Sequence, residues 1–487
     1  LLFEDDLYSD ERNWITNLEE LILYTEELNL PFRVLGINAG QFHNAGADAA
    51  QELAFSMSIA TEYIDELTEK EVPLETIFSQ FFLSYSIGSS YFKEIAKLRA
   101  ARILWTNLVQ SFGGEEFKNP RIPIYAFTSL WNKTDYDPHT NMLRTTTEAM
   151  SAAIGGSDVM VIHPFDYRFR EPDDFSERIA RNQYLMLDEE AHFTKVDDPA
   201  GGSYYVEMLT NKLAESAWKL FQNIESQGGF YKAAQKGVIQ NMIHESRTKQ
   251  MGDLARRKNV MVGINDFPNP EDRALERARE DYNRSNIPSE NNSYELNRDN
   301  FLSSLGDALQ KGALLGDLLP ELISSTSNNI QTVSTGNIAE PFRRLRLQTE
   351  RFEEENNHRP EVFIMPLGNP KWGAARGTFS TNFFGVAGYS IQENIPFKSV
   401  DEAVEELKKS GAEITVLCSS DKEYSDIVPE VAEKMHQESV ESTLVLAGNP
   451  GDNEDFYRSH GIDHFIYKDI NVLHFLEKMQ LELGITE

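Results

Sequence analysis

Residues 33–39 read Arg-Val-Leu-Gly-Ile-Asn-Ala, a short apolar run that ends in a glycine-containing turn, and residues 47–67 continue with helical spacing. A run of the first kind favours a buried strand, whereas the longer stretch with few β-branched residues favours a helix. The same order recurs, with strands predicted at 122–129, 158–164 and 202–206 and helices at 140–154, 175–190 and 207–226. Such alternation is typical of parallel βα units, so this part of the chain is predicted to be α/β.

A second series of strands and helices begins at Glu361, after a polar segment at 282–300 and a charged helical connector at 343–355. The predicted strands are 362–367, 389–392, 414–418, 443–447 and 464–467, and the predicted helices are 378–384, 400–410, 423–437, 453–460 and 472–483. This pattern predicts a flavodoxin-like, doubly wound sheet. The polar segment cannot bury enough apolar area to be core, so a domain boundary is placed there.

The composition restricts the class of protein. The 487 residues include 46 basic and 78 acidic side chains, which gives a formal net charge of −32 and a pI near 4.7. A surface this acidic repels phosphate backbones, which argues against general nucleic-acid binding. The single cysteine, Cys418, cannot form an internal disulfide, which favours a reducing compartment. No apolar run approaches the roughly 18 residues of a membrane span, so none is predicted.

Small-molecule sites in such folds lie at the carboxyl ends of the strands. After Leu367 the sequence reads Gly-Asn-Pro-Lys-Trp-Gly-Ala-Ala-Arg-Gly, which could cradle a phosphate at a helix start or form a structural turn. The stretch lacks both the Gly-Lys-Ser/Thr of a P-loop and the dinucleotide Gly-x-Gly-x-x-Gly fingerprint. The structural turn is therefore the favoured interpretation.

Several imidazole and basic side chains are weaker candidates. His43 and His139 lie at or near strand ends, where they could transfer protons or only hold hydrogen bonds, and the second role is favoured. His460 and His464 are four residues apart, but Gly461 and the following strand argue against a helical metal pair, so no metal site is predicted. Three basic residues within 89–105 could reach a phosphate, although a surface position is favoured: Lys97, Arg99 and Arg102.

Longer motifs carry the most specific signal. They are Asn44-Ala-Gly-Ala-Asp-Ala-Ala-Gln-Glu-Leu-Ala-Phe, Glu94-Ile-Ala-Lys-Leu-Arg-Ala-Ala-Arg-Ile-Leu-Trp, Asp137-Pro-His-Thr-Asn-Met-Leu-Arg-Thr-Thr-Thr-Glu-Ala-Met, Phe175-Ser-Glu-Arg-Ile-Ala-Arg-Asn-Gln and Asp198-Pro-Ala-Gly-Gly-Ser-Tyr-Tyr-Val-Glu. In this order they resemble the methylmalonyl-CoA mutases, through most of 33–265 and more weakly over 361–487. The resemblance implies the second half of a TIM (β/α)8 barrel over 1–265, a partly helical linker over 266–360 and a degenerate cobalamin-binding-like, flavodoxin-fold domain over 361–487.

The resemblance also implies a chemistry. The family barrel binds an acyl-CoA, and the C-terminal domain binds adenosylcobalamin, whose homolysis starts a radical isomerisation between methylmalonyl-CoA and succinyl-CoA. Cobalamin-binding members carry Asp-x-His-x-x-Gly after the first strand of that domain, where this chain has 369–377 and no histidine between His358 and His436. The matching positions are degenerate, so no cofactor is predicted to bind at Lys371, Gly373, Arg376, Cys418, Ser420, Ala447 and Gly448.

The barrel motifs depart from the family in the same way. Gln41 stands where the family has its active histidine, and Tyr125 and Phe127 replace a histidine and a glutamine that contact the acyl-CoA. Gln80 replaces an arginine that precedes a stretch expected to be helical. No catalytic residue is predicted, and an active enzyme would have to use His43 and Lys118 instead.

These departures predict a non-catalytic small subunit that supports a homologous, adenosylcobalamin-binding large subunit as a heterodimer, with acyl-CoA bound only through that partner. The alternatives are an active acyl-CoA mutase with a divergent site and a free-standing binding module derived from a mutase. About four βα units are predicted and the chain begins at Leu1 without a methionine, so we expect a fragment or a processed chain. The expected location is a bacterial cytoplasm, with the mitochondrion as the alternative.

Overall fold

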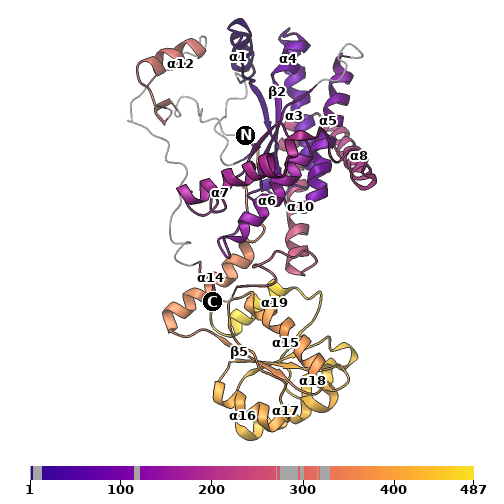
Figure 1. The fold of residues 1–487 in the computed structure, drawn as a ribbon, viewed down its shortest axis with the longest axis vertical. Coiled ribbons are helices and arrows are strands. Elements are labelled where there is room, and N and C mark those ends of the chain that lie inside the picture. Colours follow the sequence, from indigo (N-terminus) through magenta and orange to yellow (C-terminus); the bar gives the residue numbers. More distant parts are fainter. Residues whose placement is uncertain are drawn as a thin grey trace. The chain divides into compact units, whose positions relative to one another are not determined.

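A computed structural model describes residues 2–3, 14–113, 121–269, 271–274, 294, 296, 301–314, 316–318 and 330–486. The chain divides into two compact units (Figure 1). Within the described residues, the first unit takes its members from 1–133, 141–248 and 281–338, and the second from 134–140, 249–280 and 339–487. The domain boundaries at 265 and 360 stay predictions.

The first unit is built on a four-stranded sheet in the order β1-β2-β3-β4, with every neighbouring pair parallel. The strands are β1 (Leu35–Asn38), β2 (Phe81–Ile87), β3 (Ile124–Thr128) and β4 (Val159–Val161). The helices are α1 (Trp14–Glu27), α2 (Gly40–Asn44), α3 (Ala49–Glu69), α4 (Leu74–Gln80), α5 (Tyr91–Gly113), α6 (Thr140–Ile154), α7 (Asp174–Leu185), α8 (Tyr204–Ser226), α9 (Phe230–Gln235), α10 (Val238–Ala255) and α12 (Phe301–Gln310), with short helical turns η2 (Met186–Glu190) and η3 (Phe193–Lys195). Parallel strands in chain order are the arrangement of a (β/α)8 barrel, so the predicted fold class is confirmed.

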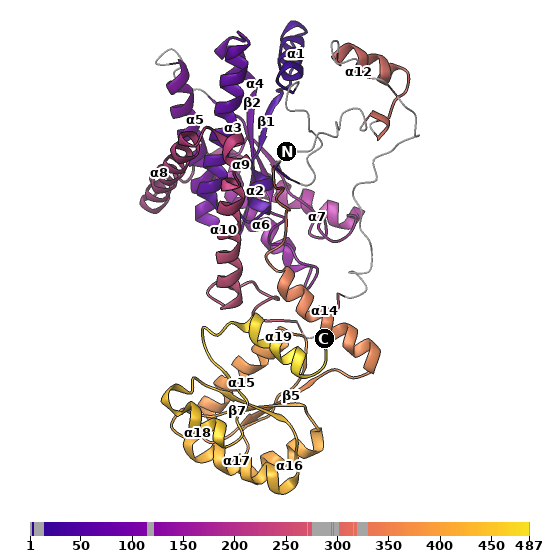
Figure 2. The same cartoon turned by 180° about the vertical axis from the view of Figure 1, so that it is seen from behind.

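The two faces of this sheet have different surroundings. Leu35 and Ile37 of β1 belong to the same buried cluster as Leu83 of β2 and side chains of α3, α5 and α8. Figure 1 and Figure 2 both show these three helices beside the sheet. On the opposite face Val159 and Val161 of β4 are exposed. Because strand side chains alternate between faces, one face is core and the other is open along this edge.

The strand predicted at 202–206 is wrong. Gly201 and Gly202 form a turn, in which Gly202 has a φ of +78°, and α8 begins at Tyr204. The buried residues of α8 follow helical spacing from Val206 through Thr210, Leu213 and Ala217. The adjacent Tyr204-Tyr205-Val206 has high strand propensity, but the packing of α8 against α3 and α5 decides the structure.

The stretch after Gln80 is a strand, not a helix. Strand β2 (Phe81–Ile87) pairs with both β1 and β3, for example Leu83 with Ile37 and with Ile124. The sequence Phe-Phe-Leu-Ser-Tyr-Ser-Ile is rich in aromatic and apolar residues and is almost wholly buried, as a central parallel strand requires. It lies between the other strands and completes the sheet of the first unit.

The second unit has a five-stranded parallel sheet in the order β6-β5-β7-β8-β9. The strands are β5 (Glu361–Pro366), β6 (Ser390–Gln392), β7 (Ile414–Cys418), β8 (Thr443–Ala447) and β9 (His464–Ile466). The helices are α14 (Glu340–Asn356), α15 (Pro370–Gly385), α16 (Val400–Ser410), α17 (Tyr424–Glu438), α18 (Glu454–Ser459) and α19 (Val472–Glu482), with a short turn η5 (Gly451–Asn453). This strand order is the flavodoxin-like one, so the doubly wound sheet is confirmed.

The turn after β5 is much shorter than predicted. Gly368, with a φ of +70°, and Asn369 are the only residues between Leu367 and α15, which begins at Pro370. The Asn369 side chain accepts hydrogen bonds from the backbone N–H groups of Lys371 and Trp372 and so caps the helix. Pro370 suits the first helical position. The predicted glycine-rich loop is therefore largely the first turns of a helix.

Helices cover both faces of the second sheet: α15 and α19 lie on one side and α16, α17 and α18 on the other (Figure 1, Figure 2). Phe383 and Phe384 of α15 are fully buried, and both pack edge-to-face on Phe475 of α19. Trp372, in the first turn of the same helix, is half exposed. The aromatic core of this unit thus lies toward the end of α15. Within the described residues, none of the helices has the length and apolar character to cross a membrane.

We expect Phe383→Ala to lower the free energy of unfolding by about 3–5 kcal/mol, because it removes a fully buried aromatic side chain from a closely packed contact. Urea denaturation of the full chain, followed by circular dichroism, measures the loss. Trp372→Ala, on the same helix but half exposed, is the matched control. A loss no larger than that of the control would show that α15 does not cover a filled core.

Candidate functional site

The strand ends of the first unit bring one histidine into contact with two other elements. His43 lies on α2, directly after β1, and its Nδ1 is 3.2 Å from Glu52 Oε1 on α3. Its Nε2 is 2.8 Å from Ser129 Oγ, which follows β3. Gly88, after β2, leaves room for the imidazole, because a Cβ there would stand 3.0 Å from the His43 ring. The histidine therefore joins three strand ends.

Beneath His43 lies a buried charge network. Lys97 Nζ of α5 is 3.0 Å from Glu52 Oε1, 2.7 Å from Glu94 Oε2 and 2.6 Å from the Ser86 carbonyl oxygen. Burial alone would raise the pKa of Glu52, but Lys97 and His43 hold it below its ordinary value. Burial opposes the charge on Lys97, yet Glu52 and Glu94 raise its pKa. The surface position favoured for Lys97 is wrong: the amine is fully buried and holds the structure together.

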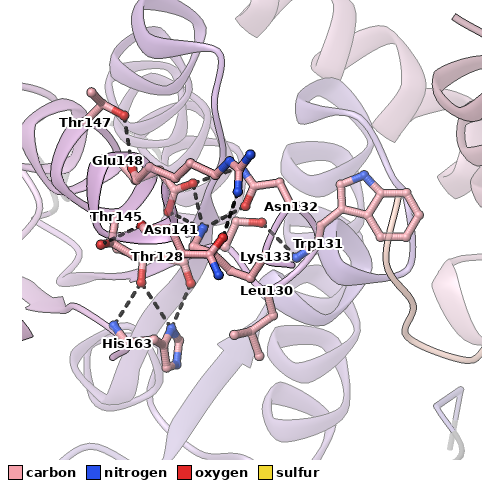
Figure 3. Close-up of polar contacts among 12 residues, drawn as sticks. Thr128, Leu130, Trp131, Asn132, Lys133, Asn141, Thr145, Thr147, Glu148 and His163 are labelled. Carbon is pink, nitrogen blue, oxygen red and sulfur yellow. Dashed lines mark hydrogen bonds and ion pairs between the residues drawn. The ribbon is translucent and has the colours of Figure 1, made fainter. Parts of the chain in front are cut away.

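A second buried ion pair lies after β3. Lys133 Nζ is 2.8 Å from both carboxylate oxygens of Glu148 on α6, and Asn132 donates to the same carboxylate at 2.9 Å (Figure 3). Burial lowers the pKa of Lys133, and burial likewise raises the pKa of Glu148. The two hydrogen bonds from Lys133 offset part of this loss of hydration. The Glu148 carboxylate is thus paired with residues of this unit.

Sequence reasoning missed His163, which follows β4. Its Nδ1 lies 2.8 Å from the Thr128 carbonyl oxygen, and its backbone N–H donates to Thr128 Oγ1 (Figure 3). The imidazole stacks on Phe127 and contacts Tyr167 at a ring distance of 4.5 Å. Its position at a strand end, two residues after Val161, was the signal that could have found it.

Ser129, His43 and Glu52 are connected in the order nucleophile, base and orienting carboxylate. Nevertheless, Ser129 is 0% exposed, and its Oγ also accepts the backbone N–H of Trp131 at 3.0 Å. An acyl group could not reach this hydroxyl. The arrangement therefore ties the ends of β1 and β3 together, as the structural interpretation of His43 predicts.

The positions at which the resemblance implies that ligand residues are replaced form packing contacts of their own. Tyr125 lies 4.9 Å from Phe82, ring to ring, and Phe127 stacks on His163. The Gln80 side chain accepts the backbone N–H of Val34 and is buried. Gln41 is half-buried on α2, beside His43 in sequence. Lys118 lies outside the described residues.

In the second unit, one carboxylate joins the turns that follow β5 and β7, at the strand ends where doubly wound sheets hold ligands. Oxygen Oε2 of Glu423 accepts the backbone N–H of Asn369 and of Ser420, at 3.2 and 3.4 Å, and the hydroxyls of Ser419 and Ser420. The Ser420 hydroxyl and the Asn369 N–H lower the pKa of Glu423, which keeps it charged. A side chain at Gly368 would clash, because its Cβ would stand 2.9 Å from Glu423 Cδ.

Arg376 of α15 reaches residues that follow β7 and β8. Its guanidinium pairs with Asp421 and stacks on Tyr424 at 5.0 Å. Gly448 leaves room for this side chain, since a Cβ there would lie 2.9 Å from Arg376 Nη1. The Ala447 carbonyl oxygen accepts the Tyr424 hydroxyl at 2.7 Å.

The remaining degenerate positions offer no metal ligand. Lys371 is exposed on α15, and Gly373 packs against Pro366. Cys418 is fully buried, and burial raises the pKa of its thiol to about 12. Adenosylcobalamin held through an axial imidazole does not fit these residues, because they include no histidine and because Glu423 and Arg376 already contact other groups of the chain at these strand ends.

The other candidate histidines are exposed or hydrogen-bonded. His139 is exposed. His460 Nδ1 lies 2.8 Å from the Phe456 carbonyl oxygen, and His464 Nε2 lies 2.7 Å from Glu482 Oε2. Over the part of the chain that the structure describes, no group of three or more histidine, cysteine, aspartate or glutamate side chains could hold a metal ion.

Comparison with known proteins assigns the fold and these motifs to a family. The family model described as methylmalonyl-CoA mutase matches residues 5–344. The methylmalonyl-CoA mutase small subunit of Porphyromonas gingivalis is 39% identical over 93% of this chain and 66% of its own length. That of Streptomyces virginiae is 31% identical over 93% and 65%, and the methylmalonyl-CoA mutase of Escherichia coli is 26% identical over 89% and 66%. The chain thus spans just under two thirds of the length of these relatives.

We expect Lys97→Met to destabilise the full chain by about 3–5 kcal/mol, because it leaves Glu52 and Glu94 buried without a cation. Urea denaturation at neutral pH measures the change. Adding Glu52→Gln and Glu94→Gln should recover part of the loss, whereas Lys408→Met, which breaks an exposed pair with Glu438, should change little.

This stabilisation should also depend on pH. Because the folded pKa of Glu52 is lowered, its contribution is present near neutral pH and is lost as the pH falls below the ordinary carboxyl value through the lowered one. The difference between the wild type and Lys97→Met should therefore shrink on acidification. A difference that is small at neutral pH, or that grows in acid, would contradict the buried network.

We expect Cys418 to resist thiol reagents in the native protein, because burial raises its pKa to about 12 and the thiolate is the reactive form. Labelling with a chromogenic disulfide at pH 8 should give no reaction without denaturant and one thiol per chain after unfolding. Rapid labelling of the folded chain would refute the closed packing of β7 against α15.

Proposed function

This chain belongs to the methylmalonyl-CoA mutase family, and on that premise we propose that it serves as the non-catalytic small subunit of such an enzyme. Its role is to bind and support a homologous large subunit, which carries adenosylcobalamin and isomerises methylmalonyl-CoA to succinyl-CoA. Several relatives bear the name small subunit, which supports this assignment over a catalytic one.

The observation that carries the proposal is the set of contacts that Glu423 and Arg376 make at the strand ends of the second unit. A cobalamin-binding relative needs an axial histidine after the first strand, and this chain has a capped helix there, with Lys371 on its exposed side. Glu423 and Arg376 make their contacts at these strand ends. A carboxylate that already accepts four hydrogen bonds from the chain gains little from a ligand that must displace them.

The first unit supports the same proposal from its own strand ends. The polar groups that remain there are satisfied by one another: His43 by Ser129 and Glu52, and Glu148 by Lys133. Tyr125 and Phe127 offer rings in place of acyl-CoA-binding polar groups. When a binding site loses a polar group that pairs with its ligand, its discrimination in favour of that ligand falls by orders of magnitude. Acyl-CoA recognition is therefore assigned to the partner.

The soundest test combines subunit pairing with a cofactor count. The chain is co-expressed with a homologous chain that carries Asp-x-His-x-x-Gly, and the purified complex is assayed for bound adenosylcobalamin and for mutase activity. We expect one cobalamin for each pair of chains, and no saturable heat when adenosylcobalamin is titrated into this chain alone. A micromolar site in the isolated chain, or a large subunit that is fully active and stable by itself, would overturn the proposal.

Variants separate this proposal from the alternative of an active mutase. Gln41→His and Tyr125→His in this chain should leave the activity of the complex unchanged, because the catalytic residues belong to the partner. His43→Gln should lower the stability of this chain, because it disturbs the bond to Ser129, without lowering the turnover of intact complex. A loss of turnover with pairing intact would favour an active site at His43.

A further inference from the structure

A cavity of about 310 Å³ lies in the helical layer of the first unit, apart from every strand-end residue discussed above. Arg99, Arg102 and Ile103 of α5 form one wall, and Ile154 at the end of α6 forms another. Thr210 of α8 lies across from them. The volume of the cavity is at the lower end of the range for small-molecule sites.

Three hydrogen-bond donors at this cavity have no partner among the residues that the structure describes. Arg99 Nε, Arg102 Nη1 and Thr210 Oγ1 are buried and unbonded, and Thr210 is only 1% exposed. Buried polar groups in folded proteins are nearly always satisfied, by protein, water or a ligand. Since these three atoms come from two helices and line one cavity, a single ligand could satisfy them together.

The rest of each guanidinium is already fixed. Arg99 pairs with Asp198, and its Nη2 lies 2.7 Å from Glu207 Oε1. Arg102 Nη2 lies 2.9 Å from Asp158 Oδ2 and also donates to the Gly156 carbonyl oxygen. These bonds hold both planar groups in place, so their remaining N–H groups are preorganised for an acceptor.

The surrounding charges restrict the ligand. Arg99, Arg102 and the nearby Arg121 are balanced by Asp158, Asp198 and Glu207, so the site has no excess of positive charge for a phosphate dianion. A carboxylate carries one charge and accepts from guanidinium groups in a well-matched geometry. Ile103 and Ile154 provide an apolar surface for a short aliphatic tail.

We propose that this cavity binds a short-chain aliphatic carboxylate, whose oxygens accept from Arg99, Arg102 and Thr210 and whose alkyl chain lies on Ile103 and Ile154. All the residues of this site belong to the first unit. The proposal does not depend on the proposed subunit role.

Ligand-observed NMR on the full chain, with butyrate as the probe, tests the proposal. We expect saturable binding in the millimolar range and at least tenfold weaker binding of the neutral isostere butyramide and of inorganic phosphate. Thr210→Val, which removes one donor at nearly constant shape, should weaken butyrate at least fivefold. Arg102→Gln should abolish detectable binding, while Arg178→Gln, at an exposed arginine of α7, should change nothing.

The proposal is overturned if butyrate gives no saturable signal, since the cavity then holds only water. Butyramide or phosphate binding as tightly as butyrate would overturn the carboxylate assignment. Arg102 also supports Asp158, so circular dichroism of each variant accompanies the titrations. Butyrate binding that survives in correctly folded Thr210→Val and Arg102→Gln would place the ligand elsewhere and refute the site.

Discussion

The buried amine of Lys97 is the contact on which the first unit depends. It neutralises Glu52 and Glu94 inside the helical layer and donates a hydrogen bond to the carbonyl oxygen of Ser86 near the end of β2. Through Glu52 the same network reaches His43 and so the ends of β1 and β3. An ion buried this deeply is stable only when every partner stays in place, so the network fixes the register between the sheet and its helices.

This constraint explains which family motifs the chain keeps. Glu52, Glu94 and Lys97 lie in stretches that match the methylmalonyl-CoA mutases, and all three are buried in the network rather than placed at an accessible site. Replacing one of them alone would leave an uncompensated charge in the core. Such residues are retained for folding, whether or not the chain catalyses a reaction.

At the strand ends, several polar groups are satisfied by other residues of the chain. Glu423 accepts four hydrogen bonds from the turns after β5 and β7, and Lys133 pairs with Glu148 beside β3. A folded chain without a ligand has to satisfy such groups internally or through water, because unpaired buried groups are costly. At the cavity lined by Thr210, three donors have no hydrogen-bond partner among the described residues.

The sequence alone determined the order of elements in the second unit: its five strands were located within one or two residues, because each is a short apolar run bounded by turn residues. It also predicted that ligand residues are replaced at positions such as Gln41 and Lys371, a prediction that rests on motif spacing, which is local information. Tertiary structure decided the rest. Whether Tyr204-Tyr205-Val206 forms a strand or a helix depends on the packing of the segment that follows it against α3 and α5. Whether Lys97 is a surface or a core residue depends on two carboxylates, one of them 45 residues away in the chain. Contacts between distant segments set burial and pairing, and no local pattern encodes them.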